Sequence, residues 1–197
     1  MNMQRLHATA NTQAQPHTIT TYNRTSKLLH WGMAGLIFYM LYLGLTMTDL
    51  PLGIEKIRLY GLHKSLGICV LSLLMLRVAW RVITMTPKPM TGMSVRLVLA
   101  ARATHYAMYA LMLCMPITGW LMSSAAGFPV APFGFFTLSA LIAPSPSALE
   151  FFKETHELLA FLFMGMISLH VIAALYHHFY RKDATLRRML PFVRRVE

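Results

Sequence analysis

The sequence is poor in charged residues, and above all in acidic ones. Only 13% of its 197 residues are charged and seven are Asp or Glu, whereas 56% are hydrophobic. Soluble domains have about a quarter charged residues, so this chain lacks the polar surface that would cover a soluble core. The composition therefore predicts an integral membrane protein.

Cysteine is also scarce. Cys69 and Cys114 both lie in apolar stretches, which argues against a disulfide framework, and no C-x-x-C-H motif is present for covalent attachment of c-type haem. Lys and Arg outnumber the acidic residues and give a net charge of +11. In so apolar a chain this excess is expected on one side of a membrane, so we expect no nucleic-acid partner.

Long apolar stretches recur four times, at about residues 28–47, 62–83, 103–123 and 158–176. Each is close to the ~20 residues that a helix needs to cross a bilayer. Prolines break the apolar stretch 124–155, so we expect a loop on the membrane surface with a short interfacial helix. The predicted fold is an all-α, integral membrane four-helix bundle, with a short polar connection at residues 48–61.

The polar ends of the chain complete the predicted organisation. Residues 1–21 lack the apolar core of a secretory signal and predict a flexible tail, residues 22–183 form the membrane domain, and residues 184–197 form a basic tail. The two ends and the 83–102 loop with its flanks hold fourteen of the eighteen Lys and Arg. The positive-inside rule therefore predicts both termini in the cytoplasm.

Histidines recur near the ends of the predicted spans. His156 and His170 are fourteen residues apart in the last span, which puts them on one helix face and ~21 Å apart along its axis. The alternating direction of the spans places His63 at the level of His156, near the outer edge. At the inner level, His170 can meet either His30 or His105.

Two imidazoles that face each other across a bundle can supply both axial ligands of a haem iron. A hydrogen-bonded structural or proton-relay role is the alternative for each histidine. Zinc is less well suited, because a level with two histidines lacks the remaining protein ligands.

Small and basic residues accompany these histidines. Gly44 and Gly67 would let a flat macrocycle approach the backbone, or they serve ordinary helix packing. Arg77 and Arg81 would pair with propionates at the inner level, or they extend to the membrane interface.

Several motifs occur together and in order, and they resemble the bacterial cytochrome b561 family. The resemblance covers about residues 20–192. The motifs are Tyr22-Asn23-Arg24, His30-Trp31, Leu62-His63-Lys64-Ser65-Leu66-Gly67, His156-Glu157, His170, His177-His178 and Lys182-Asp183 followed by Thr185-Leu186 and Met189.

This resemblance implies a cytochrome of the bacterial inner membrane with two b-type haems. It selects His30 over His105 as the partner of His170 and agrees with the pair of His63 and His156. His105 would then contact a propionate or a quinone, or face the lipid headgroups.

The expected function is electron transfer between a periplasmic donor or acceptor and membrane ubiquinone, in its sharpest form as a superoxide:quinone oxidoreductase. Lys56, Arg58 and Lys64 would attract an anion to the outer site. One alternative is a haem-bearing membrane anchor of a dehydrogenase or hydrogenase. Another is a haem-free, proton-coupled transporter that uses the same histidines.

Overall fold

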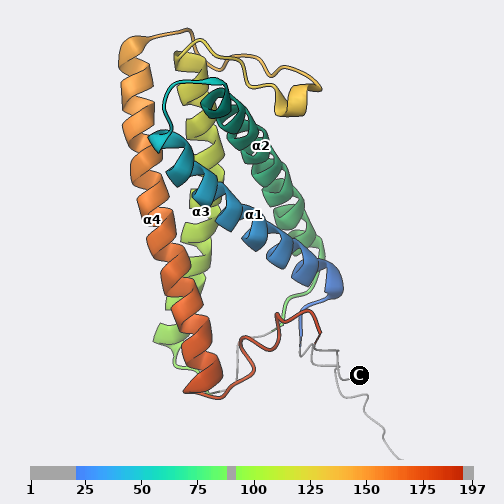
Figure 1. Ribbon diagram of the computed structural model, residues 1–197. Helices are drawn as coiled ribbons and strands as arrows, with labels where there is room; N and C mark the ends of the chain where they lie inside the picture. Colours follow the sequence, from blue (N-terminus) through green and yellow to red (C-terminus); the bar gives the residue numbers. More distant parts are fainter. Residues whose placement is uncertain (1–20, 88–91, 193–197) are drawn as a thin grey trace, which may run out of the picture.

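Four long helices make up the molecule (Figure 1). The computed structural model describes residues 21–87 and 92–192. The helices are α1 (Arg24–Asp49), α2 (Ile54–Ile83), α3 (Val95–Ala125) and α4 (Pro146–Phe179), and a 3-10 turn, η1 (Pro132–Gly134), lies between the last two. All four are long and apolar enough to cross a membrane. The predicted all-α transmembrane bundle is therefore confirmed.

The helices extend further than the apolar stretches that predicted them. The connection expected at 48–61 was wrong in extent, because only residues 50–53 lie between α1 and α2. Residues 146–155, expected in the loop, instead form the first turns of α4. Pro146 occupies the first turn of α4, where its missing N–H is not needed, and the Ser145 hydroxyl accepts from Ala148 N at 3.3 Å. A search for apolar stretches does not detect helix ends that are polar and capped in this way.

Most of the helix surface is exposed and apolar, as a bundle surrounded by lipid requires. A small core of Met33, Ile37, Leu74, Met112 and Phe163 joins the four helices. In Figure 1, α3 and α4 run alongside each other and α2 packs against both α1 and α3. The contacts between the helices are therefore centred on this small core.

The connection from α3 to α4, residues 126–145, is called the strap below. It extends sideways over the start of α2, and η1 contacts that helix (Figure 1). The strap lies at the end of the bundle that contains His63, which we call the His63 end. The opposite end contains His30 and is called the His30 end.

At the His30 end, the segment after α4 returns to the start of α1. Trp31 Nε1 donates to Met189 O at 2.9 Å, and Thr21 Oγ1 donates to Arg188 O at 2.7 Å. Residues 184–192, predicted to be part of a tail, are thus hydrogen-bonded to the membrane domain. The rest of that predicted tail, most of the predicted N-terminal tail and Lys88 lie outside the described residues.

Candidate functional site

The structure brings histidines of different helices together at two levels. The ring centroids of His63 on α2 and His156 on α4 are 6.4 Å apart, with the ring planes at 74°. At the His30 end, the centroids of His30 and His170 are 6.3 Å apart, at 65°. His105 on α3 also lies at this end, with its centroid 5.5 Å from that of His170. The five histidines singled out in the sequence therefore form two groups of neighbouring rings, in which four are half-buried and His105 is exposed.

These separations can be compared with the size of a bis-imidazole iron site. With metal–nitrogen bonds of about 2 Å and each nitrogen about 1 Å from its ring centre, two axial imidazoles have centroids roughly 6 Å apart. The pairs at 6.4 and 6.3 Å fit this value. The contact of His105 with His170 is shorter, at 5.5 Å. Both predicted pairs therefore have about the ring separation of two axial imidazoles on one iron.

One hydroxyl orients the ring of His156. Thr118 Oγ1 donates to Cys114 O at 2.9 Å and to Met115 O at 3.0 Å, and lies 3.0 Å from His156 Nδ1. Because the hydroxyl hydrogen is directed to the carbonyls, the His156 ring donates its Nδ1–H to the oxygen. The lone pair of this imidazole then lies on Nε2, where a metal can bind it.

The ring of His63 has a different environment. Its Nδ1 is buried and has no hydrogen-bond partner, which is unfavourable for a polar atom in an apolar interior. Glycines give both rings room. A Cβ at Gly44 would lie 3.4 Å from His63 Cε1, and one at Gly119 would lie 3.2 Å from His156 Cε1. A Cβ at Gly67 would meet only Met40 Cε, at 3.8 Å, which is an ordinary packing contact.

A guanidinium group dominates the polar contacts at the His30 end. Arg77 Nε donates to the Tyr109 hydroxyl at 3.2 Å, and Arg77 Nη2 lies 3.2 Å from His30 Nδ1. Because a guanidinium only donates, His30 Nδ1 is the acceptor in this arrangement. His105 Nδ1 lies 2.7 Å from Ala101 O and is therefore its donor. Arg77 and His30, which the sequence placed at one level, are thus in direct contact.

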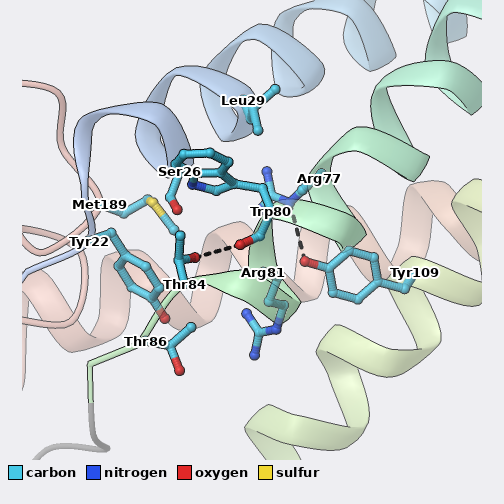
Figure 2. Close-up of a pocket in the computed structure, with 10 residues that line it drawn as sticks. All are labelled: Tyr22, Ser26, Leu29, Arg77, Trp80, Arg81, Thr84, Thr86, Tyr109 and Met189. Atoms are coloured by element: carbon cyan, nitrogen blue, oxygen red, sulfur yellow. Dashed lines mark hydrogen bonds between the residues drawn. The ribbon is translucent and has the colours of Figure 1, made fainter.

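A pocket opens beside these groups (Figure 2). The aromatic side chains of Tyr22, Trp80 and Tyr109 line it together with the two arginines, Arg77 and Arg81. Its other lining residues are Ser26, Leu29, Thr84, Thr86 and Met189. Figure 2 shows aromatic rings, hydroxyl groups and two guanidinium groups around this pocket, and Arg77, which lines it, is the side chain that lies 3.2 Å from His30.

The lysines at the His63 end have local partners. Lys56 Nζ donates to Thr48 O at 3.0 Å and to Leu50 O at 2.8 Å, so it caps the end of α1. Lys64 Nζ donates to Pro129 O in the strap at 3.0 Å. Two of the three basic residues expected to attract an anion, Lys56 and Lys64, therefore bind backbone carbonyl groups. The third is Arg58. Within the described ranges, no group of three or more His, Cys, Asp or Glu could hold a metal ion.

Thr118 and Gly119 were not singled out in the sequence. They follow Pro116 in α3 and contact His156 from a helix whose ligand-facing side had no marker other than His105. α3 is apolar all round, so its sequence pattern does not show which of its faces meets α4.

Comparison with known proteins indicates the family of this chain. The family description that matches is prokaryotic cytochrome b561, over residues 21–192. Cytochrome b561 homolog 2 of Escherichia coli is 38% identical over 176 residues, which cover 88% of this chain and 93% of the relative. The probable superoxide oxidase CybB of Yersinia pestis is 34% identical over 135 residues, covering 66% of this chain and 73% of the relative.

The family match spans all four membrane helices and both histidine levels. Two independent lines, the apolar four-helix architecture and the relatives, indicate the same class of protein. The chain therefore belongs to the prokaryotic cytochrome b561 family, and it is a multi-pass protein of the bacterial inner membrane that transfers electrons through b-type haem.

Proposed function

We propose that this cytochrome holds two b-type haems and passes electrons between a partner at the His63 end and a quinone at the His30 end. His63 and His156 would ligate one haem, and His30 and His170 the other. The observation that carries this proposal is the pair of matched imidazole separations, 6.4 and 6.3 Å, at two levels of the bundle. Because His156 and His170 are fourteen residues apart on α4, the levels are ~21 Å apart along that helix.

A haem with two imidazole ligands supplies one-electron transfer and has no open position for oxygen. At the His63 end, Thr118 fixes the tautomer of His156, and Gly44 and Gly119 leave space beside the rings. At the His30 end, ligation through Nε2 requires a proton on His30 Nδ1. Arg77 must then turn away from that nitrogen, and its guanidinium becomes free to bind a propionate.

The pocket of Figure 2 is the proposed site for the head group of a quinone, and because its volume is only about 30 Å³, the side chains around it would have to move apart to admit the ring. Quinone carbonyl oxygens accept hydrogen bonds, and the hydroxyls of Tyr22 and Ser26 and the guanidinium of Arg81 line the cavity as donors. The aromatic walls suit a flat ring. Ubiquinone is the membrane quinone that we propose for this site.

Superoxide is the candidate donor at the His63 end. It loses one electron to become oxygen, and two such electrons, with two protons from water, reduce a quinone to quinol. The similarity to a probable superoxide oxidase supports this choice. Unlike Lys56 and Lys64, Arg58 is exposed near the start of α2 and is not directed to a carbonyl by the contacts described above, so its charge can attract the anion.

Haem content and histidine substitutions test the ligand assignment. Pyridine haemochrome analysis should approach two b haems per chain. His63→Ala and His156→Ala should remove one spectral component, and His30→Ala and His170→Ala the other. His105→Ala should keep both haems. If His105→Ala removed a haem and His30→Ala did not, the assignment at the His30 end would be overturned.

Rapid mixing tests the electron-transfer partners. The purified protein should be reduced by superoxide and, separately, by quinol. A Tyr22→Phe substitution should weaken the quinol reaction and leave haem content unchanged, whereas Tyr106→Phe, outside the pocket and exposed, should change neither. Reduction by quinol without any reaction with superoxide would refute superoxide as the donor.

A further inference from the structure

The strap is fastened to α2 at two adjacent residues. Lys64 Nζ donates to Pro129 O at 3.0 Å, and Phe133 N donates to Ser65 Oγ at 3.0 Å. Phe133 has a φ of 51°, a left-handed conformation that a phenylalanine rarely adopts, and this hydrogen bond holds it there. The strap therefore has a defined position against α2.

The length of the uncharged stretch that follows these two anchor residues bears on their depth in the membrane. Lys64 and Arg77 bound a stretch of α2 without charged residues, and thirteen residues correspond to about 20 Å along the helix. Because the hydrocarbon layer is about 30 Å thick, this stretch is too short to cross it alone. One or both of its ends must lie inside the layer. Ser65, one residue further from the His63 end than Lys64, brings the middle of the strap to the same depth.

Part of the backbone of the strap finds hydrogen-bond partners within the protein. Serines of α3 bind its two ends, since Ser123 Oγ donates to Phe128 O at 2.9 Å and Ser124 Oγ accepts from Leu141 N at 3.1 Å. Trp120 Nε1 donates to Ser139 O at 3.2 Å. Inside the strap, Leu138 N donates to Val130 O at 2.9 Å. Prolines 129, 132 and 144 have no N–H to satisfy.

Irregular backbone is tolerated in a membrane only where its polar groups find partners in the protein. The ammonium group of Lys64 also has partners in the protein, because it binds a strap carbonyl and, at 3.3 Å, the hydroxyl of Ser123. A loop in water has no need of so many internal partners.

The phenylalanine side chains of the strap face outward, whereas Val130 and Pro132 are buried. The strap contains no charged residue, and Phe128, Phe133, Phe135 and Phe136 are all exposed, Phe135 to 83%. The last three belong to the tip around η1, which continues the exposed apolar surface of α2. A docking face for a soluble redox partner would be expected to carry charges that steer the encounter.

We propose that the strap is embedded in lipid: its tip, residues 133–136, inserts into the leaflet at the His63 end and extends the lipid-facing surface of α2. The occupant of this aromatic surface is the lipid itself. The aqueous approach to the His63 end is then restricted to the side where α1 meets α2 and Arg58 is exposed.

Site-directed spin labelling in phosphatidylcholine nanodiscs tests this proposal. In a chain with Cys69→Ser and Cys114→Ser, single labels would be placed by Phe135→Cys at the tip, Glu150→Cys at the same end of the bundle, and Phe38→Cys on the exposed middle of α1. The measurement is the collision rate of each label with oxygen, which dissolves in lipid, and with a water-soluble nickel chelate.

The labels at 135 and 38 should both collide far more often with oxygen than with the nickel chelate. The label at 150 should collide more often with the nickel chelate. If the labels at 135 and 150 gave the same collision rates, the tip would be in water and the proposal would be overturned. Dipolar broadening of the spectrum at 135 would instead indicate a second copy of the chain on this surface, and would overturn it too.

The anchor has its own matched control. Lys64→Met should raise both the mobility of the label at 135 and its collisions with the nickel chelate. Lys56→Met removes a lysine of the same end that binds Thr48 O and Leu50 O and does not touch the strap, so it should change neither. Equal effects of the two substitutions would refute the role of Lys64 as an anchor.

Discussion

At the scale of single residues, the two histidines of the His63 end are held differently. His156 donates its Nδ1–H to Thr118, whereas His63 Nδ1 is buried without a hydrogen-bond partner. A hydrogen bond from Nδ1 makes an imidazole a stronger electron donor to a metal and fixes its orientation. We therefore expect Thr118 to tune the electron-donor strength of His156.

Replacement of Thr118 tests this role. Thr118→Val keeps the shape but removes the acceptor. If His156 ligates a haem as proposed, the midpoint potential of that haem should rise, and the affinity of the protein for it should fall about ten-fold. Thr118→Ser should restore both. Redox titration of the haem absorbance bands measures the potentials. Unchanged potentials of both haems in Thr118→Val would show that the hydroxyl only packs.

Gly119 gives a second prediction at this scale. A methyl group there would lie 3.2 Å from His156 Cε1, closer than an ordinary contact, so Gly119→Ala should displace the ring and lower haem occupancy at the His63 end. Gly35→Ala is the control, because its Cβ would meet nothing within 4 Å. Haem absorbance per protein measures the occupancy, and an equal value for the two variants would contradict the prediction.

The positions of the histidines could be predicted from the sequence because helical rise and span direction determine depth. His63 and His156 were assigned to one level in this way, and they contact each other. Thr118 could not be predicted, because its contact with His156 depends on how α3 is rotated about its own axis. An apolar helix in lipid leaves that rotation unmarked in its sequence.

At the scale of whole elements, the start of α1 combines a cap with a contact to α2. Asn23 Oδ1 accepts from Ser26 N at 2.8 Å and from Trp80 Nε1 at 3.3 Å. Asn23→Ala should lower the free energy of unfolding by about 1 kcal/mol because the cap is lost. It should lower it further because the hydrogen bond from Trp80 is lost as well. Ser94→Ala removes only the cap of α3 and should cost less. Thermal unfolding in detergent compares them, and equal midpoints would refute the link between α1 and α2.

The turn after α4 depends on an ionised carboxylate. Burial alone would raise the pKa of Asp183, but hydrogen bonds from Thr185 and His177 outweigh it and lower the pKa to about 2. A lowered pKa in the folded state means that this contribution to stability is complete above pH ~4, the unfolded value, and is lost as the pH falls toward 2.

Asp183→Asn isolates this contribution. The variant should unfold at a lower temperature than the parent protein at pH 7, and the difference between their unfolding midpoints should shrink as the pH falls from about 4 to about 2. A series of thermal scans over this range measures it. A difference that stays constant down to pH 2 would show that the carboxylate charge does not stabilise the turn.

The existence and order of the helices could be predicted from their apolar stretches, but not where they end. α3 has 31 residues and is about 46 Å long, which exceeds the ~30 Å hydrocarbon layer. The extra turns are polar and are set by caps such as Ser94 and Ser145. The fold of the strap was not predictable either, because its anchors on Lys64 and Ser65 are distant in sequence.

At the scale of the whole molecule, the two ends of the bundle differ in charge. Four of the Lys and Arg lie at the His63 end, namely Lys56, Arg58, Lys64 and Lys153, and the strap there is uncharged. At the His30 end, Arg77 and Arg81 line the pocket, and the basic segment after α4 binds the start of α1. This asymmetry predicts a fixed orientation in the membrane, in which the pocket proposed for quinone lies on the more basic side.

Reporter fusions test the orientation that follows. Positive residues are retained in the cytoplasm, so both termini and the His30 end should face it, and the strap should face the periplasm. A fluorescent protein fused after residue 197 should therefore fluoresce, because it folds in the cytoplasm. Alkaline phosphatase fused after residue 140, in the strap, should be active, because it matures only in the periplasm. The fluorescent protein fused after residue 140 and alkaline phosphatase fused after residue 197 should both be inactive. An active phosphatase after residue 197 would place the pocket proposed for quinone at the periplasmic side and reverse the proposed orientation.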